Sequence, residues 1–287
     1  MDALDVVNQN LILWDLQDRE ERREKASKNS FWATDAYVKK EDFHDGKCAR
    51  AIYYTWKNEK VTNPPDHRSL RVLQLGKLIE SQEIGYYRRS GILIASNTKW
   101  RCPEDKVSGE IDALIYNGRK IIGVELKSSY GWYFQQQVFG TKNKDGFPKK
   151  DHVIQVMMYI HYTDIREFNL IYFDRGDMDS TKFSIILDIV GHPVVTGVPI
   201  KSGSITMPFT VEDVKKHFIN LYSNVVENKL PARDYYIEYP AEEVEKRHSS
   251  GDISETAYQD WSKKKRILGD WRCSYCSYLD ACKRDGE

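Results

Sequence analysis

Two strand-like segments joined by Asn117–Gly118 constrain the fold of this chain more than any other feature. The segments "GEIDALIY" and "KIIGVELKSS" are rich in apolar residues with interspersed charges, and Asn-Gly between such segments is the strongest short signal for a tight β-hairpin turn. A two-residue turn places Asp112 opposite Gly123 and makes Glu125 a diagonal neighbour of Asp112, about 7–8 Å away. The sequence therefore predicts an antiparallel pair of strands that carries two carboxylates on one face.

A lysine joins the two carboxylates on this predicted face. Lys127 follows Glu125 by two residues, and side chains two residues apart on a strand project to the same side. Carboxylate oxygens bind Mg²⁺ or Mn²⁺, and a lysine can orient a water molecule or stabilise developing charge. The combination of Asp112, Glu125 and Lys127 thus predicts metal-assisted hydrolysis of a phosphodiester. The simpler alternative is a solvated hairpin face. The residues expected to face the core instead are Ile111, Ala113, Val124 and Leu126.

Two predicted helices carry further polar residues that could reach the carboxylates. In "LQLGKLIE", Gly76 and Glu80 lie one helical turn apart, so the glycine permits close packing on the sheet while Glu80 reaches the metal. The helix expected over 151–162 carries Gln155 and Tyr159, an amide and a phenol that can contact a phosphate or stack on a base. Taken alone, Glu80 is equally compatible with an ordinary surface glutamate, and Gln155 and Tyr159 on a helix are more often ordinary packing residues.

Strand-like and helical segments alternate along the chain. Helices are expected at 46–56, 70–89, 151–162 and 210–228, and through most of 240–271. This order predicts an α/β fold in which a mixed central sheet is flanked by helices. We expect an N-terminal helical part (1–65), a core (66–235) and a C-terminal helical tail (236–287), with 47–287 forming one compact unit.

Composition restricts where a nucleic acid could bind. The 43 basic and 43 acidic residues give a net charge of zero, so any such surface must be a local patch. The loop 140–150 supplies one, with Lys142, Lys144, Lys149 and Lys150 expected to contact phosphates. No apolar run approaches the roughly 18–20 residues of a membrane span. The N-terminus lacks the basic segment and apolar core of an export signal, so we expect a cytoplasmic protein.

The cysteines form a second constraint. Cys273, Cys276 and Cys282 fall within ten residues, which is typical of a metal site and too tight for accidental packing. A four-coordinate site needs one more soft ligand, and Cys48 is the candidate, with Cys102 as its only competitor. An odd number of cysteines argues against a disulfide framework. Spacing alone leaves zinc and an iron–sulfur cluster both open.

Together these features resemble the PD-(D/E)xK nuclease superfamily. The similarity is greatest to its RecB-like branch with an iron–sulfur cluster, which includes the CRISPR-associated RecB-type exonucleases (Cas family four) and the AddB nuclease domain. The matched pieces are, in order, "GKCARAIYY", "LQLGKLIE", "GEID", "VELKS", "QVMMY" and "CSYCSYLDAC". The resemblance implies a restriction-endonuclease-like core with a helical iron–sulfur module. Glu80 stands where the CRISPR-associated group usually has a histidine.

The resemblance also implies roles for particular residues. Asp112, Glu125 and Lys127 would be catalytic, and Gln155 and Tyr159 would contact DNA. The ligands implied for Mg²⁺ or Mn²⁺ are Glu80, Asp112, Glu125 and the backbone carbonyl of Leu126. The ligands implied for a structural 4Fe-4S cluster are Cys48, Cys273, Cys276 and Cys282.

These inferences predict a metal-dependent DNA nuclease, with an exonuclease on single-stranded DNA or DNA ends as the first expectation. An endonuclease of the restriction or resolvase kind and a DNA-binding module that does not cut are the alternatives. The expected partners are DNA and the proteins of a DNA-processing or CRISPR adaptation complex. CRISPR adaptation, recombination and viral DNA metabolism all remain open as pathways.

Overall fold

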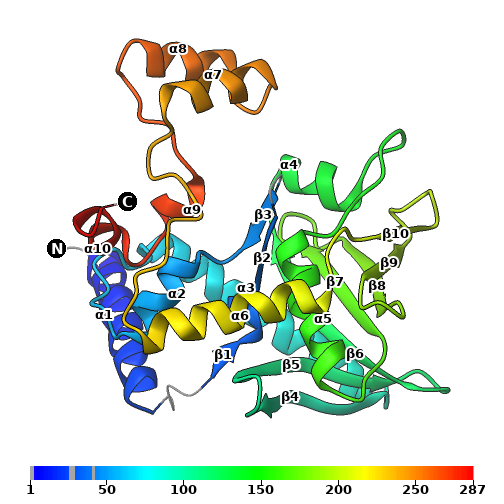
Figure 1. Ribbon diagram of the computed structural model, residues 1–287. Coiled ribbons are helices and arrows are strands. Elements are labelled where there is room, and N and C mark those ends of the chain that lie inside the picture. The colour runs from blue at the N-terminus through cyan, green and yellow to red at the C-terminus, as the bar shows by residue number, and fades with distance from the viewer. Residues whose placement is uncertain (1–2, 26–29, 41–42, 287) are drawn as a thin grey trace. The chain divides into compact units, whose positions relative to one another are not determined.

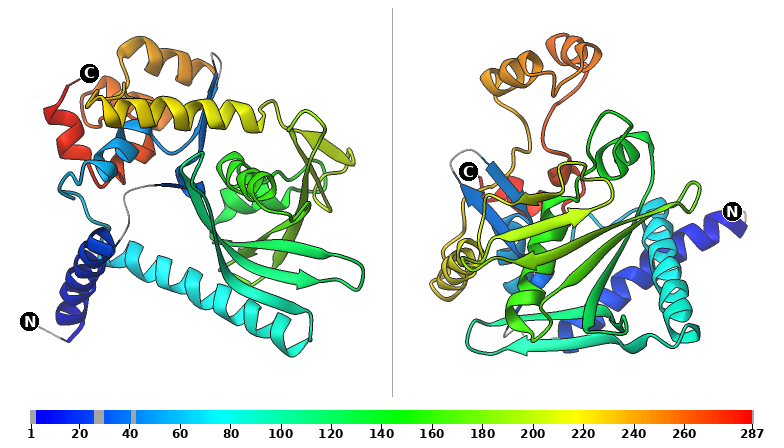
Figure 2. Two further views of the ribbon diagram at one scale, coloured as in Figure 1. Left: turned by 60° about the horizontal axis from the view of Figure 1, so that its bottom comes forward. Right: turned by 90° about the vertical axis from the view of Figure 1, so that its right-hand side faces the viewer.

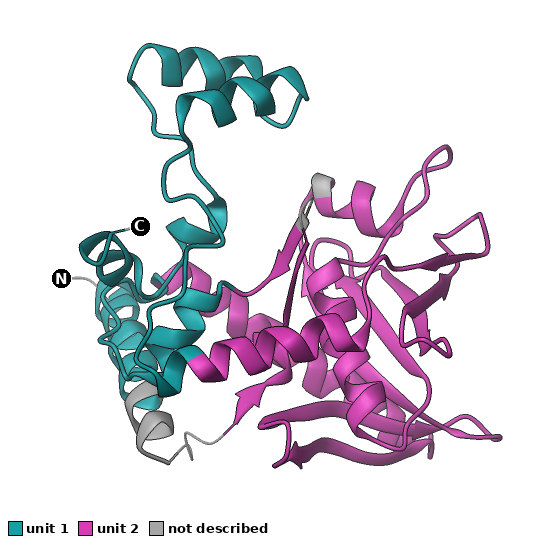
Figure 3. Ribbon diagram, viewed as in Figure 1, with its two compact units in different colours: residues 1–19, 48–66, 224–287 teal, residues 20–47, 67–223 magenta. Residues whose placement is uncertain are grey.

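The computed structural model of the chain describes residues 3–25, 30–40 and 43–286. The chain divides into two compact units (Figure 3). Unit 1 consists of residues 1–19, 48–66 and 224–287, and unit 2 consists of residues 20–47 and 67–223. The predicted boundaries differ from this division, because residues 20–47 group with the core and not with the rest of the N-terminal part.

Unit 2 is built on a mixed sheet that has eight strands within the described residues (Figure 1). The strands run in the order β1-β5-β6-β7-β8-β9-β10, and β4 pairs with β5. The β1–β5 and β6–β7 pairs are parallel and the other pairs are antiparallel. The strands are β1 (Phe31–Trp32), β4 (Leu93–Cys102), β5 (Val107–Tyr116), β6 (Ile121–Ser129), β7 (Phe168–Asp174), β8 (Ser180–Leu187), β9 (Pro193–Gly197) and β10 (Ser204–Thr206). Strands β2 (Tyr37–Lys40) and β3 (Phe43–Gly46) form a separate hairpin.

The helices agree with most of the predicted ones within a few residues. The longer helices are α1 (Ala3–Lys25), α2 (Ala49–Trp56), α3 (His67–Arg89), α5 (Lys150–Tyr162), α6 (Val211–Val226), α7 (Ala241–Ser249) and α8 (Glu255–Ser262). The shorter ones are α4 (Trp132–Phe134), α9 (Trp271–Ser274), α10 (Leu279–Arg284), the 3₁₀ turn η1 (Ala33–Asp35) and the π-turn η2 (Gln135–Phe139). None of these helices is both long enough and apolar enough to cross a membrane, as far as the described residues go.

Helices α3 and α5 cover opposite faces of the sheet, as Figure 2 shows. Leu126 of β6 packs in a buried apolar cluster with Ile79 of α3, whereas the adjacent Glu125 bonds to a side chain of α5. Gly76 lets α3 approach closely, since a Cβ at this position would lie 3.1 Å from Ser128 Oγ. The mixed α/β fold with flanking helices is thus as predicted, and α3 and α5 lie beside the strands that carry the charged residues.

The β5–β6 hairpin has a longer turn than predicted. Tyr116 pairs with Ile121, so the connection contains four residues, 117–120, and the predicted register is wrong by two positions. Asn117 explains the longer turn, because its side-chain Oδ1 accepts the backbone N–H groups of Arg119 and Lys120 at 3.1 and 3.0 Å. A shift of two residues keeps every side chain on its predicted face. The acids therefore still share a face, and they lie level with each other instead of diagonally.

Candidate active site and cysteine cluster

The candidate active site lies where strands β5 and β6 move apart. Their last paired residues are Ala113 and Val124. Beyond this pair the Asp112 carboxylate takes the place of a backbone acceptor, because the Leu126 N–H donates to its Oδ2 at 2.7 Å. On the same strand, the Glu110 carbonyl accepts a hydrogen bond from the Tyr159 hydroxyl at 3.0 Å. Side chains thus occupy the gap between the two strands.

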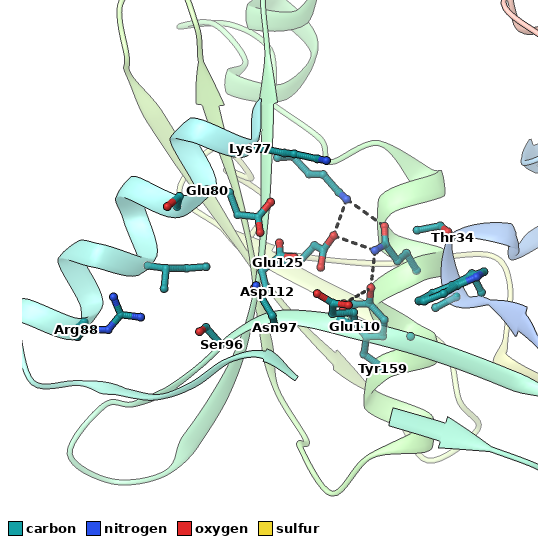
Figure 4. Close-up of a pocket in the computed structure, with 17 residues that line it drawn as sticks. Thr34, Lys77, Glu80, Arg88, Ser96, Asn97, Glu110, Asp112, Glu125 and Tyr159 are labelled. Carbon is teal, nitrogen blue, oxygen red and sulfur yellow. Dashed lines mark hydrogen bonds and ion pairs between the residues drawn. The ribbon is translucent and has the colours of Figure 1, made fainter. Parts of the chain in front are cut away.

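A continuous network of side chains connects the lysine to this gap (Figure 4). Lys127 Nζ lies 2.5 Å from Glu125 Oε1 and 3.1 Å from Gln155 Oε1. Gln155 Nε2 in turn donates to Glu125 Oε1 at 2.9 Å and to the Tyr159 hydroxyl at 2.6 Å. Since the amide of Gln155 contacts three other members, it fixes the orientation of the lysine and of Glu125.

These residues line a pocket of about 650 Å³ in unit 2. Helix α3 adds Lys77, Glu80 and Arg88 to the lining, and the segment of β1 and η1 adds Trp32 and Thr34. Of these five residues, only Glu80 is predicted from the sequence as part of the site. A signal for the two cations existed: positions 77, 80, 84 and 88 form one stripe of a helix, and all four line the pocket.

The pocket concentrates negative charge away from water. Burial raises the pKa of Asp112 to about 8, and the charges of Glu125 and then Glu80 add to this, although the Leu126 N–H and Lys127 act in the opposite direction. Burial and the charge of Glu125 also raise the pKa of Glu80. Burial lowers the pKa of Lys127, but the charge and hydrogen bond of Glu125 outweigh this effect and leave it raised. Lys127 is therefore a cation at neutral pH.

The donor set fits a hard divalent cation. Glu125 is 2% exposed, and its Oε2 is buried without a hydrogen-bond partner in the described structure. The Asp112 carboxylate lines the same pocket, and the Leu126 carbonyl points to the same strand edge as the N–H that bonds Asp112. Mg²⁺ is commonly held by one or two carboxylates together with substrate phosphates. Among residues 3–25, 30–40 and 43–286, no group of three or more His, Cys, Asp or Glu side chains is arranged to hold a metal ion, and this holds for the cysteines as well as for the carboxylates.

The residues predicted to contact DNA occupy different environments. Tyr159 is 2% exposed, and its ring lies 5.9 Å from that of Trp100 and 5.7 Å from that of Phe168, so no base can stack on it in this structure. Gln155 is likewise buried and bonded within the network. Both side chains are therefore held in place by hydrogen bonds at the wall of the pocket, and their contact with DNA stays a prediction. The four lysines predicted in the loop 140–150 do not line the pocket, and their contact with DNA stays a prediction: Lys142, Lys144, Lys149 and Lys150, the last of which begins α5.

The cysteine cluster lies in unit 1. Cys48 precedes α2 as its N-cap, Cys273 lies in α9, Cys276 follows α9, and Cys282 lies in α10. Burial raises the pKa of Cys273 to about 12, and the charges of the other three thiols contribute to the rise. Among the described residues, however, the four thiols do not form a group that is arranged to hold a metal ion. Cys102, the competitor, ends β4 in unit 2, where its Sγ bonds to a carboxylate of Glu104.

Two arginines brace the cluster by donating to one sulfur. Cys282 Sγ accepts hydrogen bonds from Arg233 Nε at 3.3 Å and from Arg50 Nη1 at 3.8 Å. Arg50 is also bound to the Pro231 carbonyl at 2.7 Å, and Asn63 donates to the Cys276 carbonyl at 3.0 Å. N–H donors to sulfur stabilise thiolate ligands, so this environment suits a metal centre held by cysteines.

Comparison with known proteins does not assign this chain to a family. No protein-family model matches the sequence, and no curated protein matches it either. The structure has a similarity to the crystal structure of a protein designated SSO0001, with a TM-score of 0.45 and 13% identity over 92% of this chain and 93% of that one. A second similarity is to an alkaline exonuclease from Laribacter hongkongensis, with a TM-score of 0.41 and 11% identity over 81% of this chain and 100% of the other. At TM-scores below 0.5, neither similarity bears on what this chain does.

Proposed function

We propose that this chain is a metal-dependent DNA nuclease in which Asp112, Glu125 and Lys127 form the catalytic centre. The observation that carries the proposal is the buried Glu125 carboxylate. It has one oxygen on the Lys127 ammonium and the other without a partner in the described structure, and it lies level with Asp112 at the strand gap. Two carboxylates and a lysine in one pocket are suited to holding a divalent cation against a phosphodiester.

Each residue of the site would have a separate task. Asp112, Glu125 and the Leu126 carbonyl would hold Mg²⁺ or Mn²⁺, and Glu80 would approach from α3. When bound, the ion would supply Lewis-acid polarisation of the scissile phosphate. Lys127, already protonated and fixed by hydrogen bonds, would stabilise the charge that develops on the phosphate oxygens.

Gln155 would hold these groups in register. Its amide donates to Glu125 and accepts from Lys127, so the distance between the carboxylate and the ammonium depends on it. Tyr159 fixes the amide from the other side and is itself bound to the backbone of β5. We infer that both residues orient the catalytic groups and do not touch the substrate themselves.

The finer assignment is also part of the proposal. We infer a restriction-endonuclease-like core of the PD-(D/E)xK kind, RecB-like, that acts as an exonuclease on single-stranded DNA or DNA ends. We infer further that Cys48, Cys273, Cys276 and Cys282 hold a 4Fe-4S cluster with a structural role, for which zinc is the alternative. The support for the cluster is the placement of all four cysteines in unit 1 and the arginine donors to Cys282.

The test is a cleavage assay on end-labelled single- and double-stranded DNA with Mg²⁺ or Mn²⁺. We expect wild-type protein to cut, and Asp112→Ala, Glu125→Ala and Lys127→Ala to lose at least about 100-fold in rate while still folding. Asp105→Ala is a matched control, since this aspartate lies outside the pocket. Wild-type rates from Asp112→Ala would refute the assignment. Closed circular DNA separates the modes of cutting: nicking or linearising the circle indicates an endonuclease, and activity on ends alone indicates an exonuclease.

A further inference from the structure

We propose that the pocket holds a single DNA strand, with the backbone of the strand against Lys77 and Arg88 of α3 and one base stacked on Trp32. The inference rests on the proposed nuclease function and names the residues that would select single-stranded over double-stranded DNA. None of the three residues belongs to the catalytic centre.

Trp32 places an exposed aromatic ring in the wall of the pocket. Its side chain is 48% exposed and lines the pocket, and it has no ring or cation partner in the described part of the chain. The backbone at this position is fixed, because Trp32 N–H donates to Asp35 Oδ2 at 3.0 Å and Trp32 pairs with Ser108 of β5. Asp112 lies four residues further along β5, about 13 Å at the rise of a strand. An unpartnered indole that lines the same pocket as the carboxylates suits stacking on a base near the cut.

The opposite wall of the pocket offers cations for phosphates. Lys77 and Arg88 are exposed on α3, and neither forms a hydrogen bond or ion pair with the described residues. They lie on either side of Glu80, as Figure 4 shows. Eleven residues of helix separate them by about 16 Å. At about 3.4 Å or more per phosphate along a strand, this length spans several successive phosphates.

The distribution of charge in the pocket explains why a bound DNA strand needs a cation on each side of the acidic centre. The centre of the pocket carries Asp112, Glu125 and Glu80, which repel a phosphate backbone. Lys77 and Arg88, on either side of this centre, would hold the strand over it. The position of Trp32 adds the selection for single strands, because the faces of a base inside a duplex are already stacked on their neighbours, whereas an unpaired base has a face to offer.

The proposal is tested by binding of a fluorescein-labelled single-stranded oligonucleotide, followed by anisotropy. All variants are made in full-length protein with the Asp112→Asn substitution, so that Mg²⁺ can be present without cleavage. Trp32→Ala should weaken binding by about 5- to 150-fold, the usual contribution of one stacked base. Trp32→Phe should restore most of the loss. Trp132→Ala, which removes a tryptophan that is 74% exposed and outside the pocket, should leave binding unchanged.

The cations are tested by the salt dependence of the same binding. Lys77→Gln and Arg88→Gln should each reduce the slope of log affinity against log salt by about 0.7, the value for one phosphate of a single strand. Arg89→Gln is the matched control, because Arg89 lies beside Arg88, rests on the ring of Tyr86 and does not line the pocket.

The outcomes separate the inference from the function on which it rests. If wild type cuts, Asp112→Asn does not, and Trp32→Ala binds as tightly as its parent, the inference is wrong and the nuclease proposal stands. If wild type cuts no DNA with either metal, the nuclease proposal fails whatever Trp32 does. An oligonucleotide with abasic sites gives an independent check: it should bind more weakly to the parent, and Trp32→Ala should cause no further loss. An equal loss on abasic and normal DNA would contradict stacking.

Discussion

At the scale of single residues, the protonation of Asp112 makes the free energy of unfolding depend on pH. Asp112 has a pKa of about 8 in the folded protein against 3.8 for an ordinary aspartate, chiefly because it is buried and next because Glu125 is charged. Between these two pH values the unfolded chain has released the proton that the folded protein still holds. Raising the pH from about 4 to about 8 therefore lowers the free energy of unfolding, by up to about 1.4 kcal/mol for each pH unit.

Asp112→Asn should remove this dependence. We expect the metal-free variant to be more stable than wild type near pH 8, with a difference that shrinks towards pH 4, since asparagine resembles the protonated acid. Urea unfolding in EDTA across this range measures the effect. Asp105→Asn is the control with the opposite sign: burial raises the pKa of Asp105, but hydrogen bonds from Tyr162 and Lys215 leave it lowered. An Asp112→Asn variant less stable than wild type at pH 8 would contradict the argument.

Proton release from Asp112 should also govern metal binding. A proton and a cation compete for the same carboxylate, so affinity for Mn²⁺ should rise as the pH increases towards about 8. Isothermal titration of the full-length protein with Mn²⁺ at several pH values measures this. Affinity that does not change between pH 6 and 8 would show that the buried carboxyl is not a ligand.

At the scale of elements, the pairing of β6 with β7 holds in place the strand that carries Glu125. Gly123 lies opposite Phe168, and a Cβ at Gly123 would be 2.2 Å from a carbon of the phenyl ring. Gly123→Ala should therefore lower the free energy of unfolding by about 1–3 kcal/mol. Adding Phe168→Leu should recover part of this loss if the clash is its cause.

A second glycine provides the control for this substitution. Gly85 lies in α3, where the atom nearest to a new Cβ is the tip of Arg89 at 3.9 Å. Gly85→Ala should stabilise the protein by about 0.5–1 kcal/mol, because alanine favours helix. Chemical unfolding of the two single variants and the double variant is the measurement. A neutral Gly123→Ala would mean that the strands can separate at this point.

The elements also show what could be predicted from the sequence. The alternation in β5 and β6 was enough to place Asp112, Glu125 and Lys127 on one face, and an error of two positions left that result intact. The turn itself was not predictable, because the bonds from Asn117 Oδ1 that lengthen it are local side-chain chemistry. Trp32 was missed because β1 has only two residues, too few for any periodic pattern.

At the scale of the whole molecule, Cys48 and the three C-terminal cysteines come from distant parts of the chain and belong to the same unit 1. Cys48→Ser should abolish binding of the proposed cluster and loosen unit 1, whereas Cys102→Ser should change neither. The measurements are iron and acid-labile sulfide in protein purified without oxygen, and limited proteolysis of unit 1. A colourless wild-type preparation with stoichiometric zinc would replace the iron–sulfur assignment by a zinc site. Cluster loss from Cys102→Ser alone would contradict the choice of Cys48.

Unit 1 is made of three separate segments of the chain, so it cannot be completed until the last segment has been synthesised. Arg50 and its sulfur partner Cys282 are 232 residues apart in the sequence. At about 5–20 residues per second of synthesis, roughly 10–50 s pass after Cys48 emerges before its partners exist. All of residues 67–223 emerges during this interval, so unit 2 can fold first. If Cys48 is a ligand of the proposed cluster, its thiol would stay reduced and without a metal during this interval, and oxidants present during synthesis would then block assembly of the cluster.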